Sequence, residues 1–203
     1  MTPAFLLASL LLAVSPGPGV AFIVARTLAG GRRAGLAGVA GIALGNFANA
    51  LGAALGVAAL LALAPSGYAL LRYAGSGYLI WLGVQSLRAV GAPSASPAVP
   101  EGGARAMRDG LLVALLNPKT LLFFAAFLPQ FVPPDANPAL SSVGLGATFV
   151  AIAALTDSGY ALAAGAAAKL LARDARARVA GRLLSAGVLI GLGLYAALAL
   201  PGQ

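Results

Sequence analysis

Long apolar blocks, separated by short stretches rich in glycine, proline or basic residues, make up most of this chain of 203 residues. The blocks lack the alternation of a half-buried strand and exceed the roughly 9–11 residues of a membrane-spanning strand. Each is long enough to cross about 30 Å of hydrocarbon as a helix. We therefore predict an all-α membrane protein of six transmembrane helices. Their ranges are Ala4–Ala25, Leu36–Ala64, Tyr68–Leu87, Gly110–Val132, Ser142–Ala168 and Leu183–Leu200.

The composition excludes several classes of protein. Hydrophobic residues make up 60% of the chain and charged residues only 9%, whereas a soluble domain carries about 25% charged residues. The chain contains no Cys and no His, which are the usual ligands of zinc, copper and iron. We therefore expect no metal site and no cofactor.

The basic residues indicate how the chain crosses the membrane. Eleven of the thirteen Lys and Arg residues lie in the loops after the first, third and fifth spans. The positive-inside rule places these loops in the cytoplasm and both termini outside. Because topology explains the net charge of +8, we expect no nucleic-acid partner. The first apolar block is predicted to be a retained span, since no basic residue precedes it and a proline follows it.

The two halves of the chain resemble each other. At an offset of 110, residues 72–83 match residues 182–193 at six of twelve positions, including the arginine and both glycines. The first and fourth spans are each interrupted by a proline after a polar residue. We predict a 3+3 inverted-topology repeat in one transmembrane domain, with residues 1–90 as the first three-helix repeat, 91–109 as a cytoplasmic linker and 110–203 as the second repeat. In secondary transporters built this way, interrupted helices form the substrate site.

The interruptions are the first candidate binding elements. Ser and Asn are favoured helix N-caps and Pro is favoured at the first helical position, so Ser15-Pro16 and Asn117-Pro118 each predict the start of a half-helix. Such starts offer free N–H groups and a positive dipole end to a carboxylate. The alternative is a simple proline kink. The predicted substrate-binding residues of the breaks are Ser15, Pro16, Gly17, Pro18, Gly19, Asn117 and Pro118.

Two ionisable residues lie deepest in apolar sequence, Lys119 and Asp157. A charge at a helix centre costs about 2.5–3.5 kcal/mol on insertion scales, so each needs a partner. One interpretation is a fixed Lys119–Asp157 pair that only locks the bundle. The other gives Lys119 a substrate-binding role toward the substrate carboxylate and makes Asp157 the proton-coupling residue. Asp157 is chosen because we count it as the only acid within an apolar span.

Further polar residues complete the predicted substrate site. Asn46 and Asn49 project from one helix face, either into the site or into hydrogen bonds between helices. Thr156 and Tyr160 flank the predicted proton-coupling residue and line the site or pack. The pairs Gly41/Gly45 and Gly52/Gly56 have the small-xxx-small spacing of close helix packing, and we do not count them as site residues.

Several motifs together resemble the lysine exporter (LysE/RhtB) family of amino-acid exporters. The motifs are Ser15-Pro-Gly-Pro-Gly19, Arg32-Arg-Ala-Gly-Leu36, Gly41-Ile-Ala-Leu-Gly45, Tyr78-Leu-Ile-Trp-Leu-Gly83, Leu116-Asn-Pro-Lys119 and Phe127-Leu-Pro-Gln-Phe131. The resemblance covers essentially the whole chain. It implies a multi-pass protein of the bacterial cytoplasmic (inner) membrane that exports amino acids with the proton motive force. The chain agrees in having no phosphate-binding loop.

The resulting prediction is a proton-coupled secondary exporter of amino acids or related small polar metabolites, and not an enzyme. The alternative is an ion channel or metal-cation transporter. An intramembrane enzyme is disfavoured because no nucleophile lies at a workable spacing from a base. The expected partners are an amino-acid substrate, protons and the lipid bilayer. The sequence leaves the oligomeric state open, with a homodimer among the alternatives.

Overall fold

The structure is a computed structural model that describes residues 2–56, 65–88, 103–171 and 175–198. These residues form helices joined by short connections, and none of them lies in a strand. The helices are α1 (Pro3–Val14), α2 (Pro18–Ala54), α4 (Pro65–Arg88), α5 (Gly103–Leu115), α6 (Pro118–Leu122), α7 (Pro138–Leu171) and α8 (Ala175–Leu198). After α6, the chain continues as a turn of π-helix, η1 (Phe123–Phe127), and a turn of 3₁₀ helix, η2 (Leu128–Phe131). The all-α prediction is confirmed.

Several described helices have the length and composition of membrane spans. α2 and the segment Pro138–Ala168 of α7 qualify alone. A third span results if Gly103–Leu115 and Pro118–Phe131, which meet at a bend of 51°, are taken as one broken helix. Most of the predicted linker, residues 91–102, lies outside the described residues. Residues 103–109, also predicted as linker, form the first turns of α5.

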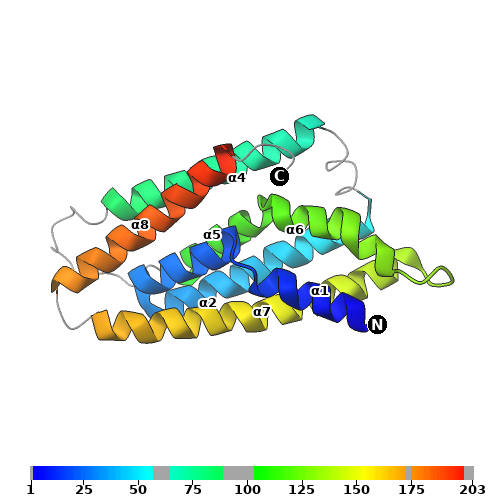
Figure 1. The fold of residues 1–203 in the computed structure, drawn as a ribbon, viewed down its shortest axis with the longest axis horizontal. Helices are drawn as coiled ribbons and strands as arrows, with labels where there is room; N and C mark the ends of the chain where they lie inside the picture. The colour runs from blue at the N-terminus through cyan, green and yellow to red at the C-terminus, as the bar shows by residue number, and fades with distance from the viewer. Residues whose placement is uncertain (1, 57–64, 89–102, 172–174, 199–203) are drawn as a thin grey trace.

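The long helix α2 consists of two antiparallel arms, residues 18–30 and 32–54. The turn is at Gly31, whose φ of 77° is a left-handed conformation that favours glycine. A Cβ built on Gly35 would overlap Thr27, and one on Gly38 would lie 3.1 Å from Phe22. Pairs at these spacings lie opposite each other across a hairpin. Figure 1 shows the two arms side by side, in two shades of blue.

Glycines let the second arm of α2 lie directly against α5. A Cβ at Gly41 would lie 1.9 Å from the Met107 carbonyl oxygen, and one at Gly45 would lie 2.7 Å from that of Leu111. The predicted packing role of Gly41 and Gly45 is therefore confirmed. For Gly52 and Gly56 no such contact is found, because no described atom outside the adjacent residues and the helix's own backbone lies within 4 Å of either Cβ position. Gly56 instead follows the end of the helix with a φ of 76°, a position that favours glycine.

Helices α4 and α8 pack against each other as a pair (Figure 1). Their contact is reciprocal. A Cβ at Gly83 would lie 2.5 Å from Ile190 Cγ1, and one at Gly193 would lie 2.7 Å from Ile80 Cγ1. The two glycines differ by 110 in number, and so do the two isoleucines, so the offset found in the sequence relates both sides of this interface.

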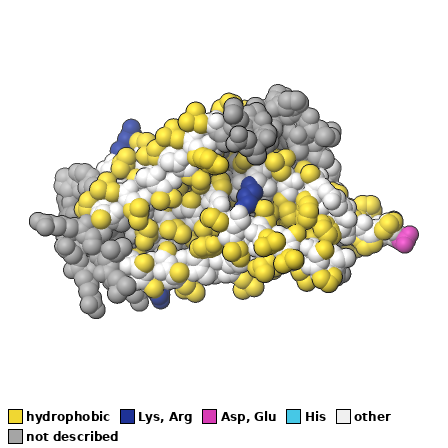
Figure 2. All heavy atoms as spheres, in the orientation of Figure 1, with side chains coloured by type: hydrophobic (Ala, Val, Ile, Leu, Met, Phe, Trp, Pro, Cys, Tyr) yellow, Lys and Arg dark blue, Asp and Glu magenta, His cyan; other side chains and the backbone are white. Residues whose placement is uncertain are grey.

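Large apolar side chains cover the outside of the bundle. Figure 2 shows that hydrophobic side chains dominate this face and that only a few basic ones appear on it. α1 illustrates the pattern, since it buries Phe5, Ser9 and Ala13 along one stripe, while Leu7 and Leu11 are 59% and 64% exposed. Such an exterior suits lipid rather than water.

Candidate functional site

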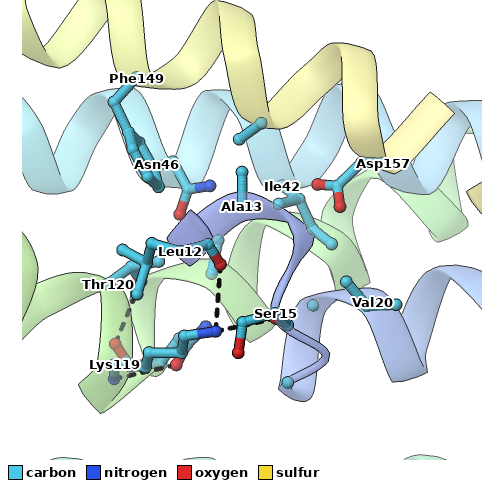
Figure 3. A pocket seen from close by; sticks show the side chains of 15 residues that line it. Leu12, Ala13, Ser15, Val20, Ile42, Asn46, Lys119, Thr120, Phe149 and Asp157 are labelled. Atoms are coloured by element: carbon cyan, nitrogen blue, oxygen red, sulfur yellow. Dashed lines mark hydrogen bonds between the residues drawn. The ribbon is translucent and has the colours of Figure 1, made fainter. Parts of the chain in front are cut away.

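A cavity lies where the α1–α2 and α5–α6 connections meet the second arm of α2 and α7 (Figure 3). It encloses about 450 Å³ of empty space, part of which is open to solvent. From the α1–α2 side it is lined by Leu12, Ala13, Ser15, Gly17, Gly19, Val20, Ile42 and Asn46. From the α5–α7 side it is lined by Ala114, Asn117, Lys119, Thr120, Phe149, Ala153 and Asp157.

The second helix break has the predicted geometry. α5 ends at Leu115, and α6 starts with Asn117 as its N-cap and Pro118 as its first residue. The Asn117 side-chain oxygen accepts a hydrogen bond of 3.1 Å from the Lys119 backbone N–H. The backbone therefore turns through the break without leaving this N–H unpaired.

The first break differs from its prediction by two residues. Ser15 ends α1 rather than starting α2, because its N–H donates to the Leu11 carbonyl at 3.0 Å and completes the last turn. α2 starts at Pro18, with Gly17 as an N-cap that has no side chain to contribute. Pro16 is not among the cavity-lining residues. Pro18 and Pro118 line a separate hollow of about 330 Å³, beside α4 and α8.

Lys119 connects the two breaks. Its ammonium donates hydrogen bonds to the Leu12 and Ser15 carbonyl oxygens, at 3.2 and 2.8 Å, and so caps the C-terminal end of α1. It forms no ion pair with Asp157 among the described residues, so the predicted fixed pair is not present in this structure. A Cβ at Gly17 would lie 3.7 Å from the Lys119 Nζ. The glycine thus leaves space beside a cation.

The opposite wall of the cavity holds polar atoms that have no hydrogen-bond partner in the described part of the chain. Phe149, Ala153 and Asp157 follow one another at four-residue intervals along α7 and so form a single stripe that faces the cavity. Asp157 is 6% exposed, and no described group donates a hydrogen bond to it. The buried side-chain oxygen of Asn46 likewise accepts no hydrogen bond from any described residue. Because buried polar groups in proteins are nearly always satisfied, these oxygens are available to a ligand.

Besides the prolines of the two breaks, three further predicted site residues do not line the cavity. Asn49 donates to the Ala114 carbonyl at 2.9 Å, which is the alternative role of joining helices. The Thr156 hydroxyl donates to Ala153 of its own helix at 2.9 Å. The Tyr160 hydroxyl donates to the Val14 carbonyl at 2.8 Å and thereby holds the end of α1 on α7. Tyr160 therefore contacts α1, whose last residues line the cavity, but does not line the cavity itself.

A second buried acid was not predicted from the sequence. Asp109 on α5 is fully buried and forms an ion pair with Arg26 of α2. It also accepts hydrogen bonds from the Tyr78 hydroxyl at 3.1 Å and from Arg108 at 3.3 Å. Asp157 is the only acid within a predicted apolar span, but it is not the only acid buried in the described helices. The signal was present in the Arg105–Asp109 spacing of four, which places both residues on one helix face.

The apolar wall of the cavity was also not predicted. Phe149 and Ala153 carry no chemistry of their own, and only the rotation of α7 about its axis shows that they face the cavity.

Among the described residues, no three His, Cys, Asp or Glu side chains are grouped so that they could hold a metal ion.

Known proteins resemble this chain over most of its length. The profile described as "LysE type translocator" matches residues 10–200. A "Homoserine/homoserine lactone efflux protein" of Salmonella typhimurium is 33% identical over 159 residues, covering 78% of this chain and 77% of the relative. A "Leucine efflux protein" of Klebsiella pneumoniae is 31% identical over 135 residues, covering 66% of this chain and 64% of the relative. No solved structure matches the chain.

Proposed function

Because this chain belongs to the LysE type translocator family, we propose that it is a secondary active exporter of amino acids or related small polar metabolites. The relatives named above for efflux of homoserine and leucine support an amino-acid substrate, and they lend no support to an ion channel or metal-cation transporter. The observation that carries the proposal is the cavity between the two helix breaks. It holds Lys119 on one side and the unpartnered oxygens of Asn46 and Asp157 on the other.

The charges of the cavity suit the two ends of an amino acid. The substrate carboxylate binds beside Lys119, whose ammonium has a third proton left after its bonds to Leu12 and Ser15. The glycines at 17 and 19 leave the first turn of α2 open to the same carboxylate, at the positive end of the helix dipole. The substrate ammonium binds to Asp157 and Asn46. The substrate side chain lies against the apolar wall.

The proposed topology has six spans in two inverted repeats. The hairpin of α2 supports it, because the turn at Gly31 gives α2 two antiparallel arms. The first span is then α1 with the first arm, the second is the second arm, and the third is α4. The fourth is α5 through η2, followed by α7 and α8. The reciprocal contacts of Gly83 and Gly193 support a two-fold relation between the halves. With the basic loops in the cytoplasm, both termini lie outside the inner membrane.

We assign proton coupling to Asp157. Of the two acids buried in the described helices, Asp109 is held by Arg26 and Tyr78. Asp157 faces the cavity without a protein donor, so substrate and proton can compete for it. An exporter that exchanges protons for substrate needs a group that binds either one from each side of the membrane in turn. Asp157 is placed to be that group.

The test is uphill efflux in proteoliposomes that contain the purified protein. With an imposed pH gradient, the protein should move radiolabelled homoserine or leucine against its concentration gradient. Asp157→Asn should abolish this uphill movement while preserving downhill exchange. Asp135→Asn, which removes an exposed acid in the connection before α7, is the matched control and should leave uphill movement at the wild-type rate. If the wild-type protein moves neither amino acid, the proposed substrates are wrong. If Asp157→Asn exports uphill at the wild-type rate, the coupling assignment is wrong.

A further inference from the structure

The ion pair of Arg26 and Asp109 is an unusual feature for a chain with so few charges. Only five acids occur in the sequence, and the Asp109 side chain is completely shielded, with the Arg26 side chain 9% exposed. Three helices meet at this carboxylate, because Arg26 comes from α2, Asp109 from α5 and Tyr78 from α4. The Arg26 guanidinium also lies 5.6 Å from the centroid of the Phe22 ring, a cation–π distance.

The ion pair lies between the cavity and the loop end of the helices. Arg26 follows the cavity-lining Val20 by six residues, about 9 Å along the first arm, in the direction of the Gly31 turn. Asp109 precedes the cavity-lining Ala114 by five residues, about 7.5 Å along α5, in the direction of its N-terminus. Arg26 and Asp109 are therefore both displaced from the cavity toward the basic loops that the positive-inside rule places in the cytoplasm.

At this level, direct helix contacts close the other gaps around the first arm. Thr27 packs on Gly35 of the second arm, and a Cβ at Gly35 would lie 3.4 Å from the Ala161 Cβ of α7. The Ser185 hydroxyl of α8 donates to the Ala25 carbonyl at 2.9 Å. The gap between the first arm, α4 and α5 is instead bridged by Arg26, Asp109 and Tyr78.

We propose that Arg26, Asp109 and Tyr78 form the gate that closes the cavity toward the cytoplasm, and that substrate enters when Asp109 releases the other two. The cytoplasmic assignment rests on the orientation given in the proposed function. A charged closure suits this task. The attraction within a buried ion pair is largely offset by lost hydration, and hydration is regained when water enters the opening. An apolar closure would instead expose apolar surface to water each time it opened.

The natural absence of cysteine allows a direct test by labelling. Thr120→Cys places one thiol in the cavity wall. In a separate reference protein, Ser86→Cys places one thiol near the end of α4, and its labelling rate shows how much reagent reaches the loop side of the membrane. A membrane-impermeant maleimide is applied to inside-out and right-side-out membrane vesicles. The gate variants are Tyr78→Phe, which removes one hydroxyl, and Asp109→Asn. The matched control, Tyr195→Phe, makes the same substitution at a tyrosine of α8 that is 71% exposed and does not line the cavity.

In inside-out vesicles, the cavity thiol of both gate variants should react with the maleimide roughly tenfold faster. This is the shift in the equilibrium between closed and open gate expected when a hydrogen bond to a charged group is lost. In the Tyr195→Phe control, the cavity thiol should react at the same rate as without that substitution. An unchanged rate in a folded Tyr78→Phe protein overturns the gate, even if Asp109→Asn fails to fold. An increase confined to right-side-out vesicles overturns the cytoplasmic assignment.

Amino-acid efflux by the wild-type protein is measured separately in proteoliposomes. If that efflux is absent while labelling responds as expected, the proposed function fails and the gate stands. If efflux is present while labelling is unresponsive, the gate fails and the proposed function stands.

Discussion

Replacing Gly41 by alanine should loosen the contact between α2 and α5 and destabilise the protein. The added Cβ would lie 1.9 Å from the Met107 carbonyl oxygen and 2.9 Å from its Cα. The first distance is about 1.5 Å short of the 3.4 Å at which ordinary contact begins. Both obstructing atoms belong to the backbone, so no rotamer change relieves the overlap and the two helices must move apart.

Overpacking of a well-packed interior typically costs about 1–3 kcal/mol, and we expect the upper end of this range, about 3 kcal/mol, because the obstruction is backbone. For a chain of this size, each 1 kcal/mol lowers the melting temperature Tm by about 2–4 °C, so Gly41→Ala should lower it by about 6–12 °C. The measurement is thermal unfolding of the purified protein in a mild detergent, followed by intrinsic fluorescence.

Gly52→Ala is the matched control in the same helix, because no atom of another described element lies within 4 Å of its Cβ position. Alanine stabilises a helix interior by roughly 0.5–1 kcal/mol relative to glycine, so the Tm of this variant should equal or slightly exceed that of the wild type. A Gly41→Ala protein that melts within about 2 °C of the Gly52→Ala protein would refute the packing argument.

Three further predictions concern the site and the topology. Lys119→Ala should weaken substrate affinity in a binding titration and lower the Tm, because the Leu12 and Ser15 carbonyls at the end of α1 lose their donor; unchanged affinity would exclude Lys119 from the site. Asn117→Ala should lower stability by about 0.5–2 kcal/mol through loss of the helix N-cap, measured by thermal unfolding, and an unchanged Tm would contradict the capping role. Alkaline phosphatase fused after residue 203 should be active outside the cytoplasm, and an inactive fusion of normal abundance would overturn the proposed orientation.

Much of the architecture is encoded locally and could therefore be predicted from the sequence. The apolar blocks identify helices because a chain in lipid must satisfy its own backbone hydrogen bonds. Asn117-Pro118 predicts a helix start because capping depends on adjacent residues, and the structure has this start. Gly41 and Gly45 predict a close helix contact because one face without side chains can only be filled by a neighbouring backbone. At Ser15-Pro16 the same local reasoning erred by two residues, because the serine N–H still belongs to the preceding helix.

Only the tertiary structure decided which distant groups meet. Lys119 and Asp157 are the deepest ionisable residues within the predicted spans, yet the lysine bonds to carbonyls more than a hundred positions away rather than to the acid. Asp109 lies at the edge of a predicted linker, yet it is buried against Arg26, 83 positions away. Such pairings depend on the rotation of each helix about its axis and on its depth along its neighbours. These quantities are set by the packing of the whole bundle, and no local pattern of residues encodes them.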